Sequence, residues 1–128
     1  MIINGPSANL DAGVHFVEGD VRINAANTLL NGVTIVATGS ITINSSNVAL
    51  TPFAADHPAL MSGFDACTTA GITINASTIT THGTLWAPQA RVKLAASLIS
   101  SSSGAVVGSS VDMAGSSITL NRRIAFVR

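Results

Sequence analysis

A short motif returns along the chain at a nearly constant spacing, and this repeat limits the fold more than any other feature. The motif is a triplet of an apolar, a polar and an apolar residue. It begins at Val21 and returns after steps of 20, 31, 20 and 19 residues. Its five copies are Val21–Ile23, Ile41–Ile43, Ile72–Ile74, Val92–Leu94 and Val111–Met113. The step of 31 is one repeat of 20 with eleven extra residues, which predicts an inserted loop at about 51–70.

Two further sets of triplets run in phase with the first. The second set is Thr28–Leu30, Val48–Leu50, Ile79–Thr81, Ile99–Ser101 and Ile118–Leu120. The third set is Val14–Phe16, Val33–Ile35, Ala59–Met61, Thr84–Trp86, Ala105–Val107 and Ile124–Phe126. Glycine precedes several triplets of the third set, where a sharp corner favours a residue without a Cβ atom. Three short strands in each repeat of about 20 residues are typical of one coil of a solenoid.

The side-chain pattern predicts an all-β fold, a single-stranded parallel β-helix of about five to six coils. Alternate residues of a strand face opposite sides, so the first and third residues of a triplet point inward. In the first set every inward residue is apolar. The middle residues are all polar: Arg22, Thr42, Thr73, Lys93 and Asp112. An antiparallel sandwich is the competing fold, but it does not require a fixed register across three sets of strands.

The length of 128 residues predicts a single β-solenoid domain, 1–128. We expect an N-terminal cap at 1–12, coils at 13–120 and a C-terminal strand or cap at 121–128. No apolar run approaches the roughly 18 residues that cross a bilayer, so we expect no membrane insertion by this segment. The first residues also lack the features of a signal peptide.

Composition excludes two further classes of protein. Six Lys and Arg balance six Asp and Glu, so the chain has no basic excess with which to bind nucleic acid. A single cysteine excludes an intrachain disulfide and a cysteine-rich zinc module.

Potential ligands for a metal ion gather in and after the predicted loop. They are Asp56, His57, Asp65, Cys67 and His82. Their spacing matches no compact zinc motif. Cys67 with a histidine has no third group to orient the pair, so a catalytic nucleophile is not indicated. We therefore expect no catalytic residue, no metal site and no cofactor, and interpret the chain as a protein that is not an enzyme.

Three stretches resemble one known domain. They read GVHFVEGDV (Gly13–Val21), VTIVATG (Val33–Gly39) and LWAP (Leu85–Pro88). With the repeat they resemble the β-helical domain of bacterial envelope proteins linked to Tad or PilX-type pilus assembly. Bactofilin-like polymer-forming solenoids are a more distant match. The chain departs from the family pattern at His15 and Phe16, where that family has tyrosines.

This resemblance implies an extracellular or cell-surface structural module that acts by rigid scaffolding and adhesion. The partners it implies are other domains of a parent envelope protein or pilus components. Self-assembly of a homo-oligomer, through an outer strip or the coil ends, is a further expectation. The alternative function is a ligand-binding solenoid with a carbohydrate- or ice-binding face, and a polysaccharide-active enzyme ranks third.

Two sets of residues are candidate sites. The middle residues of the third set form a largely apolar strip that is expected to face outward. We expect it to pack against a partner domain or another copy of the chain, or else to be covered by the chain's own residues 1–12. Its interface candidates are Thr34, Leu60, Leu85 and Val106. Asn24, Asn44 and Asn75 each follow a copy of the first triplet, which predicts a structural ladder of amide side chains at one corner.

Overall fold

A computed structural model of the protein describes residues 1–54, 57–101, 105–120 and 123–126. These residues form fourteen β-strands. In chain order the strands are β1 (Ile2–Ala8), β2 (Gly13–Val17), β3 (Val21–Asn31), β4 (Val33–Ala37), β5 (Ile41–Asn44), β6 (Asn47–Thr51), β7 (Pro58–Ser62), β8 (Ala66–Asn75), β9 (Thr78–Thr81), β10 (Thr84–Ala95), β11 (Leu98–Ser101), β12 (Ala105–Ala114), β13 (Ser117–Leu120) and β14 (Arg123–Phe126). Within the same ranges there is no helix with the length and hydropathy needed to span a membrane.

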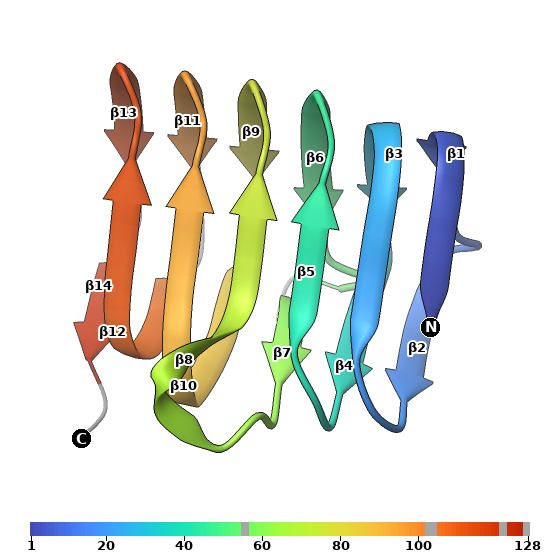
Figure 1. Cartoon of the computed structure of the whole chain (residues 1–128). Coiled ribbons are helices and arrows are strands. Elements are labelled where there is room, and N and C mark those ends of the chain that lie inside the picture. The colour runs from blue at the N-terminus through green and yellow to red at the C-terminus, as the bar shows by residue number, and fades with distance from the viewer. Residues whose placement is uncertain (55–56, 102–104, 121–122, 127–128) are drawn as a thin grey trace.

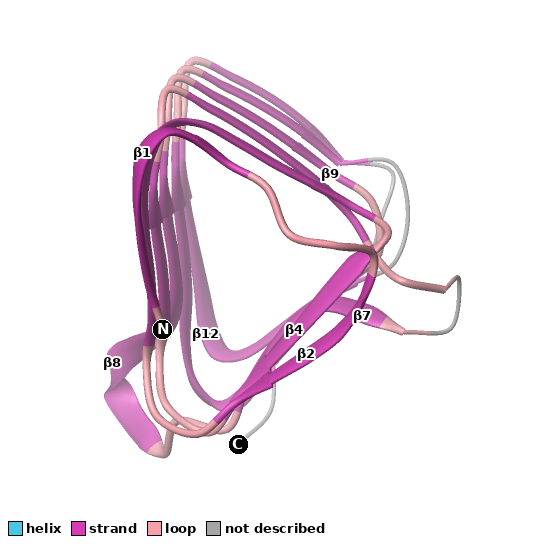
Figure 2. Cartoon of the chain, turned by 90° about the vertical axis from the view of Figure 1, so that its right-hand side faces the viewer, coloured by secondary structure: helices cyan, strands magenta, loops and turns pink. Residues whose placement is uncertain are grey.

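The strands build one parallel β-solenoid, as the repeat predicts. Every strand pairs in parallel with the strand one coil away, so the coils stack side by side along a rod (Figure 1). Viewed along the rod, the coils enclose a triangle with three flat sides (Figure 2). The backbone polar groups are satisfied between coils, which leaves the interior free for apolar side chains.

Each side of the triangle is a sheet face with its own set of strands. The first face contains β1, β3, β5, β8, β10 and β12. The second face contains the end of β1, followed by β3, β6, β9, β11 and β13. The third face contains β2, β4, β7, β10, β12 and β14. Long strands such as β3 and β10 turn a corner and therefore contribute to two faces.

The first face confirms the predicted stacking of like side chains. Ile41 pairs with Ile72 and Ile43 pairs with Ile74, in parallel and without a register shift. All four side chains are 0% exposed. The apolar residues of Val111–Met113 are only partly buried, because they lie near the end of the rod. Burial of one apolar column from coil to coil is the main source of stability in such a fold.

The second face brings hydroxyl groups into the interior. Thr81 and Ser101 point inward and are buried. Their hydroxyl oxygens lie 2.6 Å apart, one coil from each other. A buried hydroxyl without a hydrogen bond would cost free energy, so this pairing explains how the core accepts polar residues here.

The predicted asparagine ladder is present and longer than expected. Nδ2 of Asn24 donates to Oδ1 of Asn4, Nδ2 of Asn44 to Oδ1 of Asn24, and Nδ2 of Asn75 to Oδ1 of Asn44. Each donor–acceptor distance is 3.0 Å. The two inner amides, Asn24 and Asn44, each both donate and accept, so the ladder ties four coils together at one corner.

The N-terminal segment 1–12, expected as a cap, begins with a regular strand of the stack. β1 pairs with β3 from Ile2 to Ala8. Ala8 is fully buried and Leu10 packs against the core, so the link from β1 to β2 lies across this end of the rod (Figure 2). At the other end β14 pairs with β12, in the segment where a C-terminal strand was expected. Residues 121–122 and 127–128 of that segment lie outside the described residues.

The insertion expected at about 51–70 is divided between two corners. Thr51 follows its partner on β3 by 20 residues, Leu60 follows its partner on β4 by 25, and Ile72 follows its partner on β5 by 31. Five extra residues therefore precede β7 and six follow it. β7 itself lies in the third face, so the insertion lengthens two corners and leaves the stack continuous.

Candidate functional site

The four interface candidates of the third set are buried, so the expectation that they are exposed is wrong. Leu60 is 1% exposed, and Leu85 and Val106 are both 0% exposed. Leu60 pairs with Ile35 on one side and with Leu85 on the other, and Leu85 pairs with Val106. These side chains form an interior column of the third face.

On β7, β10 and β12 the triplets of the third set begin one residue too early, so their middle residues point inward. On β4 the first and third residues of the triplet do point inward, so the copies of the set are out of register with one another. The third set placed Val33 beside Val14, whereas Val33 pairs with Gly13 and Phe16 pairs with Val36. Because side chains alternate with a period of two, a slip of one residue exchanges the inner and outer faces of a strand.

Thr34 is buried for a different reason. It pairs with Val14, an outward position that is 49% exposed, yet Thr34 itself is 1% exposed. Backbone groups at the two ends of the first insertion hydrogen-bond to its side chain. Its Oγ1 donates to the carbonyl oxygen of Pro58 at 2.8 Å and accepts from the backbone N–H of Phe53 at 3.0 Å. Thr34 therefore anchors the first insertion to the third face.

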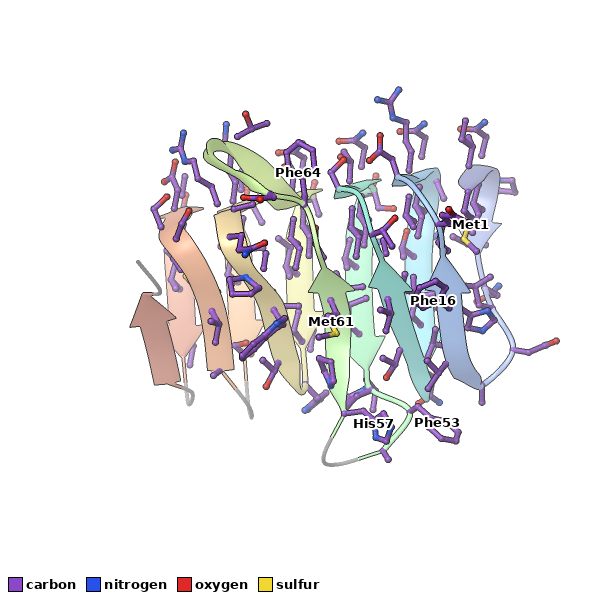
Figure 3. The ribbon with its side chains drawn as sticks, turned by 90° about the horizontal axis from the view of Figure 1, so that it is seen from below. Met1, Phe16, Phe53, His57, Met61 and Phe64 are labelled. Atoms are coloured by element: carbon purple, nitrogen blue, oxygen red, sulfur yellow. The ribbon has the colours of Figure 1, made fainter. Side chains whose placement is uncertain are left out.

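The same slip reveals an apolar row on the outside of the third face, which we call the outer stripe. Its members occupy consecutive coils in register: Phe16, Val36, Met61, Trp86 and Val107. Phe16 is 70% exposed, Trp86 37% and Val107 6%, and the other two are partly exposed. Figure 3 looks onto this face, with Phe16 and Met61 labelled.

Two shallow hollows lie beside the outer stripe. One, of about 290 Å³, is lined by Val36, Met61, Trp86 and Pro88 among others. The second, of about 400 Å³, extends from Met61 and Trp86 toward Val107. Met61 and Trp86 line both hollows and therefore stand between them. The surface of the third face is thus uneven, with raised side chains next to depressions.

Five of the six strand segments of the third face contain no charged residue. The strand segments 13–17, 33–37, 58–62, 84–87 and 105–108 contain no Asp, Glu, Lys or Arg. By contrast, the outward positions of the first face include Arg22, Lys93 and Asp112. The second face also lacks charged residues, so the row of large apolar side chains in register is what distinguishes the third face. An exposed apolar patch of this kind marks a contact surface.

The potential metal ligands do not converge in the described part of the chain. No group of three or more His, Cys, Asp or Glu is positioned to hold a metal ion there. His57 packs edge-on against Phe53, with ring centroids 5.7 Å apart (Figure 3). The backbone N–H of His82 donates to the carbonyl of Leu50 at 2.8 Å. Asp56 and the side chain of Cys67 lie outside the described residues.

Comparison with known proteins does not add a family. No protein-family model, curated protein or solved structure matches the chain. The parallel β-solenoid is therefore established from the structure alone, and the relation to Tad- or PilX-linked envelope domains stays a prediction.

Proposed function

We propose that the protein is a non-catalytic structural module that acts as a rigid rod and contacts another protein through the outer stripe. The observation that supports this most directly is the exposed apolar row of the third face. Phe16 and Trp86 together present two large aromatic side chains on an uncharged surface. Aromatic residues with partial exposure are enriched at the centres of protein interfaces.

The interior of the rod supports a scaffolding role. Ile43, Ile74 and Leu85 are 0% exposed, and each pairs in register with an apolar neighbour one coil away. A close-packed interior of this kind has low compressibility and holds its surface in a fixed shape. The outer stripe is therefore presented by a preorganised face, which lowers the entropic cost of binding.

The narrower form of the proposal places this module on the bacterial cell surface, as part of an envelope or pilus-associated protein. That form rests on the resemblance carried by Gly13–Val21, Val33–Gly39 and Leu85–Pro88. Its partners would be other domains of the parent protein or pilus components.

Photo-crosslinking in the cells that produce the protein tests the proposal. A benzophenone amino acid replaces Phe16 or Trp86, and a control replaces Leu29, which is 50% exposed on the second face. We expect ultraviolet light to give adducts with identifiable proteins from positions 16 and 86 and not from position 29. Absence of protein adducts at both stripe positions, or equal adducts at position 29, would contradict protein contact through this face.

Carbohydrate binding is the competing function, because Trp86 presents part of its indole ring beside a shallow hollow. Trp86 is the chain's single tryptophan, so its fluorescence reports directly on this site. We expect envelope oligosaccharides to leave its emission unchanged. A saturable emission change on titration with one sugar would favour the ligand-binding function.

A further inference from the structure

We propose that the third face binds a second copy of this chain, with the two rods face to face and antiparallel. The inference rests on the proposed function, because it names the partner of the same outer stripe. The two copies are related by a two-fold axis that lies in the plane of the contact and runs along β7, at right angles to the rods. Coils then meet in reverse order, and Met61 lies against Met61 of the second copy.

In that arrangement the protruding side chains of one outer stripe lie against the less exposed side chains of the other. Phe16, at 70% exposed, lies against Val107 of the second copy, which is 6% exposed. Trp86, at 37% exposed, lies against Val36, beside the hollow of about 290 Å³ that Val36 lines. A raised side chain thus meets a lower one at both pairs. An isologous contact requires this kind of self-complementary patch.

Charge permits the same pairing. No Asp, Glu, Lys or Arg occurs in the segments 13–17, 33–37, 58–62, 84–87 and 105–108. Two copies of the face therefore meet without like charges in contact and without burying an unpaired ion, each of which would oppose association.

The area of the face sets the strength of the contact. The five strands β2, β4, β7, β10 and β12 overlap in this arrangement, and β14 extends beyond the contact. Five strands at about 4.8 Å and five residues at about 3.3 Å give a flat area of about 400 Å² for each copy. The two copies together bury about 800 Å², which is below the roughly 1,000 Å² of a stable specific interface and in the range of weak, transient contacts. The dimer is therefore weak, with a dissociation constant above about 1 μM.

Sedimentation velocity on the purified chain tests the dimer. We expect the sedimentation coefficient to rise with concentration between about 10 μM and 1 mM toward the value of a dimer. Trp86 fluorescence should shift to shorter wavelength over the same range. Phe16→Lys and Trp86→Lys should each weaken association at least tenfold. Leu29→Lys, a matched apolar-to-charged change on the second face, should have no effect.

Circular dichroism of each variant verifies the fold, and Phe16→Ser replaces any lysine variant that does not fold. A chain that stays monomeric up to 1 mM overturns the dimer. Association that persists in both stripe variants, or that continues beyond a dimer, also overturns it. A monomeric purified chain that still gives protein adducts in cells would refute only the second copy as partner. If the purified chain does not self-associate and also gives no protein adducts in cells, the proposed function is refuted as well.

Crosslinking tests the antiparallel order in a Cys67→Ser background. A short bismaleimide should link Met61→Cys copies, since this position lies on the two-fold axis. Phe16→Cys alone should not be linked, because four coils at about 4.8 Å place its two copies about 19 Å apart along the rod. A mixture of Phe16→Cys with Val107→Cys should be linked. Efficient linking of Phe16→Cys alone would contradict the antiparallel order.

Discussion

Truncation of Leu85 should destabilise the fold far more than truncation of Phe16, although both residues lie on the third face. Leu85 is 0% exposed and lies between Leu60 and Val106 in the interior column. Leu85→Ala removes three apolar groups, worth about 2.4 kcal/mol of transfer free energy. The cavity adds to this loss, because hydrogen-bonded coils on both sides limit collapse. We expect the free energy of unfolding to fall by about 2–5 kcal/mol.

Phe16→Ala is the matched change on the outside of the same face. Phe16 is 70% exposed, so truncation removes few contacts and should alter the free energy of unfolding by less than about 1 kcal/mol. Urea unfolding measures both variants, followed by far-ultraviolet circular dichroism and by Trp86 fluorescence. Protein concentration is kept below 10 μM so that self-association does not contribute.

The comparison depends on the register of the third face. A loss below about 1 kcal/mol for Leu85→Ala would contradict the interior position of this side chain. A loss for Phe16→Ala as large as that for Leu85→Ala would show that the outer stripe is not at the surface of the monomer.

Three further changes test other parts of the rod. Asn44→Ala removes two hydrogen bonds of the ladder and should lower the free energy of unfolding by about 1–2 kcal/mol in urea titrations; an unchanged value would mean that water replaces the ladder equally well. Gly39→Ala places a Cβ atom 2.7 Å from the carbonyl oxygen of Gly19 and should lower Tm. Gly63→Ala is the control: the closest contact of its Cβ atom is 3.4 Å, so Tm should change less. Equal Tm values for the two variants would contradict the close approach at Gly39. Arg91→Ala breaks an exposed ion pair of 3.9 Å with a carboxylate on β12 and should leave Tm unchanged in calorimetry, so a clear fall would show a stronger pair than the geometry indicates.

The first face could be predicted from the sequence because its polarity alternates without exception. Apolar residues such as Ile41 and Ile43 flank the polar Thr42, so only one register buries the apolar pair. The ladder followed from the same alignment. Its first member, Asn4, was missed, although Ile3–Asn4 precedes Ile23–Asn24 by the repeat length of 20 residues.

The third face could not be predicted in the same way because apolar residues occur on both sides of its strands. The pattern VTIVA of β4 has no alternation that selects a register. The glycines were also misleading: Gly32 forms the turn before β4 with φ of +69°, whereas Gly13 is already in β2 and pairs with Val33. A row of small inward residues after the outer stripe was the better signal. It consists of Ala37, Ser62, Ala87 and Gly108.

The two corner insertions around β7 have a consequence for engineering. The chain lengthens by five residues before β7 and by six after it, while β7 keeps its pairing with β4 and β10. Foreign peptides grafted at these corners should therefore leave the strands intact. Because coils repeat at about 4.8 Å, peptides grafted on different coils would be spaced at fixed multiples of that distance.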